Sequence, residues 1–183
     1  MANAPRENLI RTINSRFSVR QIPDLLQSIF LAELLVPSKV FWLVSPWISD
    51  IPVLDNSSGG FGSIEPDWPL SPIPITKVLE RLVQGGTSVH VAMRDVPHNQ
   101  PVGRTLETFK LSGGAKLKIH YDQKLHEKGM LGTGYWLSGS MNFTFNGISF
   151  NNETVTFCVE PGTVASQEIS FTEAWGGKIY DPG

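Results

Sequence analysis

The sequence of 183 residues contains a single cysteine, Cys158. One cysteine cannot form a disulfide within the chain, which excludes a disulfide-stapled domain and indicates a reducing compartment. Cys158 lies in the apolar run 155–159. We therefore expect it to be a buried strand residue rather than a reactive thiol.

Long apolar runs are also missing. No stretch approaches the ~18 consecutive apolar residues that a membrane-spanning helix needs. No apolar core of a signal peptide follows Met1. The sequence therefore predicts a cytoplasmic protein that does not contact a membrane.

A third absence is an excess of positive charge. The 15 lysines and arginines are outnumbered by 17 aspartates and glutamates, which gives a net charge of −2. Any contact with nucleic acid must therefore depend on a local basic patch. The hydrophobic share of 40% and the charged share of 17% are typical of a folded globular chain. A chain of this length is sufficient for one domain with a core.

Residues 1–20 are polar and contain four spaced arginines, Arg6, Arg11, Arg16 and Arg20. We interpret this segment as an N-terminal arm, either basic and in contact with nucleic acid or solvated and loosely docked. Residues 21–183 are expected to form the single domain.

Within that domain, helix signals alternate with strand signals. Helices are predicted over 22–36, 75–83, 106–111 and 163–175. Strands are predicted over 39–48, 88–93, 116–121 and 154–159, with two short strands around 126–131 and 136–137. This order predicts an α/β sandwich, a mixed β-sheet flanked by helices. The proline-rich segment 50–74 is predicted to be a loop over the active-site end of the sheet.

His126 and Lys128 are the first candidate functional residues. In an extended strand, residues two apart point to the same side, so the two side chains would lie together. An imidazole nucleophile beside an ammonium group suits attack on an anionic phosphate. Taken alone, the pair is equally compatible with an ordinary solvent-facing strand.

The pair is followed by Gly139-Ser140-Met141-Asn142 and then by Glu153. This combination resembles the phospholipase D superfamily, whose signature is H-x-K-x4-D with a downstream G-S-x-N. The aspartate of that signature corresponds to Thr133 in this chain. In the superfamily this position supports the loop, so the change leaves the His, Lys and Asn set intact.

The resemblance implies an α/β/α sandwich and a phosphodiesterase that uses two His-x-Lys sets without a metal. The chain supplies one set, so the resemblance implies a homodimer with a two-fold axis. His126 would be the nucleophile in one subunit and the general acid in the other, and Lys128 and Asn142 would hold the phosphate oxygens. Gly139 and Ser140 would shape the pocket.

Glu153 is the expected partner of the distal ring nitrogen of His126, and would fix its tautomer and orientation. We expect neither a metal nor another cofactor, because the histidines and Cys158 lack the spacing of a zinc site.

Three further residues are candidate nucleic-acid contacts. Trp47 lies at the end of a predicted central strand and would either stack on a base or belong to the core. Arg94 and Arg104, with His98 between them, would form either a patch for the phosphate backbone or a solvated loop.

Three functions remain open. The first is a nuclease that acts on DNA, and the second is a phospholipid hydrolase, for which the sequence shows no interfacial helix. The third is a non-catalytic subunit that binds phosphate or nucleic acid, an interpretation supported only by Thr133. The stretches FLAELL, LVSPWISDIPVLDN and SGSMNFTFNG resemble the phospholipase D-like proteins of bacterial gene clusters that put 7-deazaguanine derivatives into DNA. That resemblance implies a role in DNA modification and restriction, with other DNA-modification proteins as partners.

Overall fold

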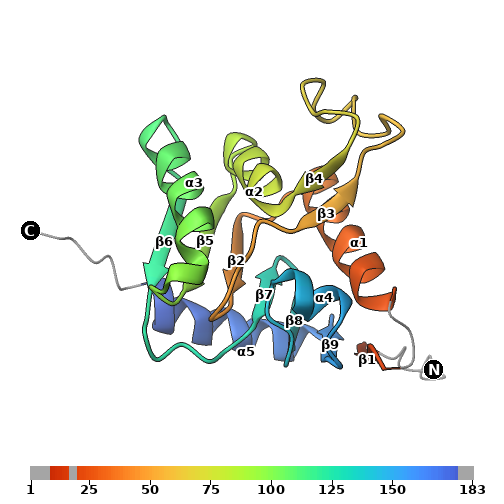
Figure 1. Ribbon diagram of the computed structural model, residues 1–183. Helices are drawn as coiled ribbons and strands as arrows, with labels where there is room; N and C mark the ends of the chain where they lie inside the picture. Colours follow the sequence, from red (N-terminus) through yellow and green to blue (C-terminus); the bar gives the residue numbers. More distant parts are fainter. Residues whose placement is uncertain (1–8, 17–19, 177–183) are drawn as a thin grey trace, which may run out of the picture.

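The structure is a computed structural model and describes residues 9–16 and 20–176 (Figure 1). Its centre is a mixed sheet with the strand order β1-β9-β8-β7-β2-β5-β6. The strands are β1 (Ile10–Asn14), β2 (Val40–Val44), β5 (Ser88–Met93), β6 (Leu117–Tyr121), β7 (Gly129–Gly132), β8 (Tyr135–Gly139) and β9 (Thr154–Cys158). Strands β2, β5 and β6 are parallel, and the remaining neighbours are antiparallel.

Helices cover both faces of this sheet (Figure 1). They are α1 (Gln21–Leu35), α2 (Ile75–Gln84), α3 (Gln100–Leu111), the short α4 (Phe145–Ser149) and α5 (Pro161–Phe171), which continues as a π-helical turn (Thr172–Gly176). A short 3-10 turn (Pro97–Asn99) precedes α3. The predicted fold class, a mixed β-sheet flanked by helices, is confirmed.

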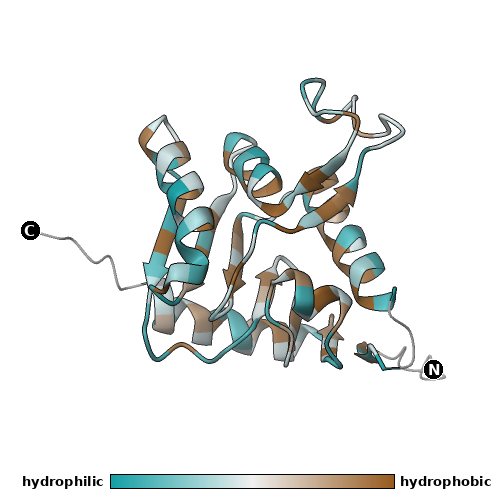
Figure 2. Ribbon diagram, in the orientation of Figure 1, coloured by the Kyte–Doolittle hydropathy of each residue, from teal (hydrophilic) through white to brown (hydrophobic). Residues whose placement is uncertain are grey.

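Alternation along the central strands divides the core into two layers. In β2, Phe41 and Leu43 pack into the larger cluster with α1, α2 and α3, whereas Trp42 and Val44 pack into the smaller cluster with α5. Each of these side chains is less than 5% exposed, and burying one stabilises the fold by roughly 1.5–3 kcal/mol. Figure 2 shows hydrophobic residues along β2, at the centre of the molecule.

Helix α1 illustrates how the sequence sets these layers. Its apolar residues Ile22, Leu26, Ile29 and Phe30 recur at helical spacing and are buried against the sheet. The helix ends at Leu35, two residues before a proline, because the residue preceding a proline disfavours helical geometry.

The α5 face also buries the predicted strand residue His90. Its ring lies against Trp42, with 3.9 Å between ring centroids, and its Nδ1 lies 3.2 Å from Nε2 of His120. Burial lowers the pKa of His90 to about 4, and the charges of Lys118 and His120 act in the same direction. Cys158 is buried in β9, as predicted.

Strand β1 lies within the segment that we interpret as a polar arm. Residues 10–14 pair along their whole length with β9, and Ile13 is buried in the core. This strand is not predictable from the sequence, because Ile13 is the only residue of β1 that is buried and the strand shows no apolar alternation. The boundary at residue 20 stays a prediction, and Arg6 lies outside the described residues.

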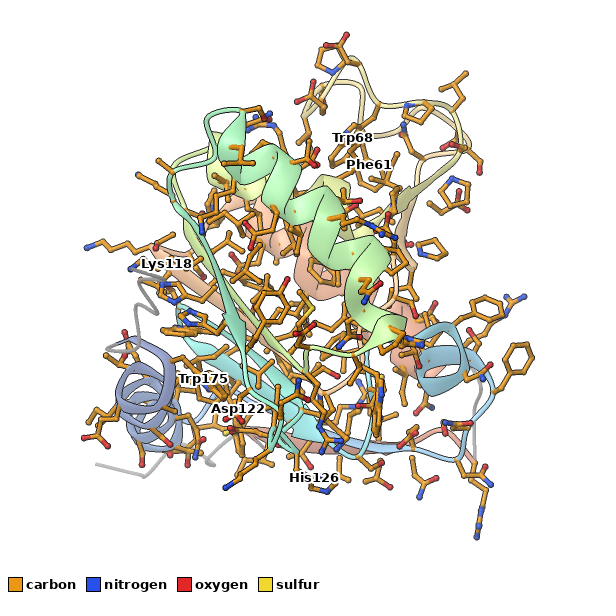
Figure 3. All side chains as sticks on the ribbon, turned by 60° about the vertical axis from the view of Figure 1, so that its left-hand side comes forward. Phe61, Trp68, Lys118, Asp122, His126 and Trp175 are labelled. Carbon is orange, nitrogen blue, oxygen red and sulfur yellow. The ribbon has the colours of Figure 1, made fainter. Side chains whose placement is uncertain are left out.

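The segment 50–74 differs from its prediction. It forms a small two-stranded sheet, β3 (Pro52–Asp55) and β4 (Pro72–Pro74), whose connecting loop packs on α2 through an ion pair between Glu65 and Arg81. Figure 3 places Phe61 and Trp68 of this loop at the opposite end of the molecule from His126. The loop therefore does not cover the candidate site, because the hairpin directs the chain away from the end of β2.

Candidate active site

Strand ends from distant parts of the sequence meet at one edge of the sheet. The strand registers pair Val44 with Gly129, Gly129 with Ser138, Gly139 with Val155, and Asn14 with Thr154. The end of β2, the start of β7, the end of β8, the start of β9 and the end of β1 therefore lie next to one another. This edge brings together the segments 45–47, 126–128, 140–142 and 153, which contain most of the candidate residues. In sheets with parallel strands, ligands bind at such carboxyl ends.

His126 and Lys128 occupy the connection that precedes β7. The strand begins at Gly129, so the expectation that both residues lie on an extended strand is wrong. Lys128 is half-buried and its Nζ donates to the carbonyl oxygen of His126 at 2.6 Å. His126 is exposed and lies at the lower end of the molecule in Figure 3.

Arg94 anchors the loop that presents His126. Its Nε donates to the carbonyl oxygen of Leu125 at 2.7 Å, and its guanidinium carbon lies 5.1 Å from the centroid of the Trp47 ring. Burial and the charge of Arg94 lower the pKa of Lys128, and the carboxylate of Glu153 opposes this shift. Two cations are thus held near each other at the sheet edge, an arrangement that favours an anionic ligand.

Glu153 and Ser140 form a compact hydrogen-bonded unit. The Oγ of Ser140 donates to Oε2 of Glu153 and accepts from the backbone N–H of Thr154 at 3.1 Å. The other carboxylate oxygen accepts from Asn151 Nδ2 at 3.3 Å, and Glu153 is only 8% exposed. Within the part of the chain that the structure describes, no hydrogen bond joins Glu153 to His126. The expected pairing is therefore not formed in the single chain, where Ser140 and Asn151 bind the carboxylate.

Gly139 allows this unit to form. It has a φ of +154°, and a Cβ at this position would clash with the carbonyl oxygen of Thr154 on the neighbouring strand. A side chain would therefore separate β8 from β9 at the point where Ser140 and Glu153 meet.

Ser15 fixes the backbone of Glu153 from the end of β1. Its Oγ accepts from the Glu153 N–H at 2.8 Å and donates to the Asn151 carbonyl at 2.9 Å. Its own N–H donates to the Glu153 carbonyl at 2.9 Å. The role of Ser15 is not predictable from the sequence, since an isolated serine in a polar segment carries no pattern.

Asn142 lies beside the end of β2. Its Oδ1 is 3.2 Å from the buried Ser45 Oγ, which also lies 2.9 Å from the Trp47 carbonyl and can donate its one proton to either. Backbone contacts tie the same two segments together, because Ser49 N–H donates to the Phe143 carbonyl at 2.8 Å. Asn142 is half-buried, and it lies on the same edge as Lys128.

Asn99 is a buried connector behind the site, only 1% exposed. Its Oδ1 accepts from the Ile48 N–H at 2.9 Å, and its Nδ2 donates to the carbonyls of Pro46 and Arg94, both at 2.8 Å. One amide thus holds the two segments that present Trp47 and Arg94. The sequence carries no local signal for this role, because Pro46 and Ile48 lie about 50 positions away from Asn99.

Thr133 lies at the other end of β7, away from the site. Its N–H donates to Ser38 Oγ at 2.6 Å, and that hydroxyl donates to Oε1 of Glu33 at 2.7 Å. The other Glu33 oxygen accepts from the Ser38 N–H at 2.9 Å, and Glu33 is only 2% exposed. A buried carboxylate from α1 therefore supports the turn at the position where the superfamily signature has its aspartate.

The remaining candidates lie beside the site. Trp47 is 37% exposed, which separates it from the core. Arg104 is exposed on α3 and lines a cavity together with Arg94. Among residues 9–16 and 20–176, Arg104 forms no ion pair. Over the same residues, no helix has the length and apolar character needed to cross a membrane.

Comparison of the sequence with known proteins gives no matching family model. No curated protein matches the sequence either. Solved structures do match the fold. NucT from Helicobacter pylori is 11% identical with a TM-score of 0.59, over 90% of this chain and 93% of that chain. Nuc from Salmonella typhimurium, a phospholipase D family member, is 15% identical with a TM-score of 0.58, over 91% and 93%.

A third match is TrmBL2, an archaeal chromatin protein with a novel mode of DNA binding. It is 12% identical with a TM-score of 0.53, over 96% of this chain and 54% of that chain. The chain therefore spans about half the length of TrmBL2. Together the matches show that the chain has the phospholipase D-like fold.

Proposed function

We propose that the chain is a metal-independent phosphodiesterase, a nuclease that cleaves DNA as a homodimer. The observation that carries the proposal is the gathering of His126, Lys128, Asn142 and Arg94 on one edge of a phospholipase D-like fold. The two cations suit the charge of a phosphodiester, and Asn142 supplies an amide. Likeness of fold to Nuc and NucT supports the same chemistry.

In the proposed reaction, a ring nitrogen of His126 attacks phosphorus and forms a P–N bond. The bond from phosphorus to the leaving oxygen breaks, and that oxygen takes a proton from His126 of the second subunit. Water then attacks phosphorus and gives a proton to the second histidine, while the P–N bond breaks and the phosphate product leaves. Lys128 and Asn142 hold the non-bridging oxygens in both steps. Exposure of His126 in the single chain leaves it open to a second subunit.

Glu153 also takes part in this scheme. Its carboxylate lies close enough to act on the pKa of Lys128, so it contributes negative charge beside the cations. A turn of the exposed His126 ring toward the site when substrate binds would bring the two into contact. Ser140 holds the carboxylate and Ser15 holds the backbone of Glu153, so the residue is fixed in position for that contact.

The biological setting that we propose is DNA modification and restriction. It is supported by the sequence resemblance to DpdK, the phospholipase D-like protein of the 7-deazaguanine gene clusters. The resembling segments include 43–56 and 138–147, which meet at the site through the bridge between Ile48 and Phe143. Other proteins of such a cluster would then be partners.

A second candidate function is a DNA-binding subunit without catalysis. The likeness of fold to TrmBL2 favours it, as does Thr133 in place of the signature aspartate. In that case the same edge binds a phosphate without cleaving it.

The test is cleavage in EDTA of single-stranded DNA, double-stranded DNA and bis(p-nitrophenyl) phosphate. We expect His126→Ala and Lys128→Ala to remove activity, and the matched control Lys124→Ala, an exposed lysine of the same loop, to retain it. If the wild type is inert while DNA still binds and Lys128→Ala weakens binding, the binding-subunit function replaces the nuclease.

The dimer has its own test. Subunits of wild type and His126→Ala are mixed in equal amounts and allowed to exchange. If both histidines of a dimer are needed, activity falls to about one quarter of that of the same total amount of wild-type protein, because random pairing gives that share of intact dimers. A fall to about one half would instead mean that each subunit acts alone.

A further inference from the structure

A cavity of about 200 Å³ opens next to the candidate active site. It lies between the end of β5, the end of β6 and the first turns of α3. The residues of its lining that matter here are Arg94, Asp95, Gly103, Arg104, Glu107 and Tyr121. Because β5 and β6 run parallel to β2, the cavity opens at the same edge of the sheet as the site.

Arg94 connects the cavity to the catalytic loop. The residue lines the cavity, while its Nε holds the carbonyl of Leu125, the residue before His126. A chain of nucleotides whose phosphate lies at His126 would therefore place its neighbouring nucleotide beside Arg94. Arg104 lies further along the cavity, exposed and with no ion pair in the described part of the chain, where it can meet the next phosphate.

The size of the cavity limits its occupant. Pockets for drug-sized ligands measure roughly 300–1,000 Å³, so this one suits a single heterocycle rather than a base pair. Gly103 keeps the space beside Tyr121, since a Cβ there would lie 2.8 Å from the tyrosine hydroxyl oxygen. A larger residue would have to displace the phenol.

The lining offers both stacking and hydrogen bonding. Tyr121 is 48% exposed, so part of its ring is free to stack on a base. Burial raises the pKa of Tyr121, and the negative charges of Glu107 and Asp95 raise it further, so the phenol stays a neutral donor. The two carboxylates are acceptors for the N–H groups that nucleobases carry on their edges.

We propose that this cavity binds the unpaired nucleobase of the nucleotide next to the scissile phosphate. This proposal adds a base-binding subsite to the proposed nuclease, and it rests on that proposed function for the position of the scissile phosphate. A base must leave its pair to enter so small a space, and this costs least in single-stranded DNA. The protein therefore prefers single-stranded or locally opened DNA over an intact duplex.

The test measures binding and not cleavage, with His126→Ala as the parent protein. The probes are a single-stranded hexanucleotide that contains 2-aminopurine and the same hexanucleotide in a stable hairpin duplex. We expect Tyr121→Ala to weaken single-strand binding about 5- to 150-fold, the usual range for loss of one stacking contact. Tyr121→Phe keeps the ring and is expected to stay within about threefold of the parent. The change in 2-aminopurine fluorescence on binding is expected to be lost in Tyr121→Ala and kept in Tyr121→Phe.

Gly103→Ala is the second variant, because it narrows the cavity from the helix side and leaves the tyrosine in the chain. It is expected to weaken single-strand binding, while Thr108→Ala, an exposed position on α3 outside the cavity lining, does not. Thermal melting confirms that each variant is folded. Single-strand affinity that is unchanged in both Tyr121→Ala and Gly103→Ala overturns the proposal, as does equal affinity for the duplex.

The two proposals fail separately. A wild type that cleaves no substrate, together with Tyr121-dependent binding of single strands, overturns the nuclease but supports the base subsite. If the wild type cleaves DNA but its DNA affinity is unchanged in Tyr121→Ala and Gly103→Ala, the base subsite is overturned and the nuclease function stands.

Discussion

Replacing Asn99 by alanine is expected to destabilise the protein strongly. The substitution removes three hydrogen bonds from a side chain that is 1% exposed. The Pro46 and Arg94 carbonyls retain other donors, the N–H groups of Arg94 and Val96 at 3.3 and 3.1 Å. The N–H of Ile48 retains none among the described residues, and Ile48 is fully buried.

The lost hydrogen bonds set the expected loss of folding free energy in Asn99→Ala. An orphaned buried N–H costs about 1–3 kcal/mol, and each of the two lost carbonyl bonds contributes about 0.5–1.5 kcal/mol. The sum is about 2–6 kcal/mol, a large share of the ~5–15 kcal/mol that stabilises a typical domain. A loss of about 4 kcal/mol lowers the melting temperature of a chain of this size by about 8–16 °C.

The assay is thermal and urea unfolding of Asn99→Ala beside Asn146→Ala. Asn146 is exposed, and within the described residues its backbone carbonyl, not its side chain, accepts hydrogen bonds, so loss of the side chain is expected to cost less than about 0.5 kcal/mol. Below its melting temperature Asn99→Ala is also expected to bind DNA more weakly, because Trp47 and Arg94 lose their common support. A melting temperature within about 2 °C of the Asn146→Ala control would refute the role of the amide.

Three other substitutions test neighbouring features. Glu33→Gln places an amide donor against the Ser38 donors and is expected to cost about 1–3 kcal/mol in urea unfolding, whereas an unchanged midpoint would show that the turn does not need the carboxylate. His90 has a pKa lowered to about 4, so the unfolded chain binds more protons and wild-type stability falls by up to about 3 kcal/mol as the pH drops from 6.5 to 4. The melting temperature of His90→Gln should change less with pH over that range than that of the wild type. An equal pH dependence would show that other groups cause the acid sensitivity. Gly139→Ala is expected to lower the melting temperature and to abolish DNA cleavage, since the new Cβ meets the Thr154 carbonyl; wild-type melting and cleavage would contradict the close approach.

The apolar pattern of the sequence predicts most of the sheet and its helices. Strand β2 follows from a nearly continuous apolar run, and helix α1 follows from apolar residues at helical spacing. Motif spacing predicts which segments form the site, and the strand registers bring those segments to one edge.

The polar contacts of the site are not predictable in this way. Asn99 and Ser15 act on partners about 50 and 140 positions away, and such contacts leave no local periodicity. The position of His126 is also missed, because the loop before Gly129 is held by Arg94 and not by strand pairing. The side chains that orient the candidate residues thus become visible only when the chain is folded.

The pairing of β1 with β9 has a consequence for how the chain folds as it is made. Thr12 and its partner Thr156 are 144 positions apart. At about 5–20 residues per second, the first strand leaves the ribosome roughly 7–30 s before its partner exists. During that interval β1 has no neighbour, and Ser15 cannot yet bind Glu153. The backbone of Glu153 is therefore fixed among the last events of folding, and slow synthesis or a pause before β9 would prolong a state in which most of the sheet is built but the site is not.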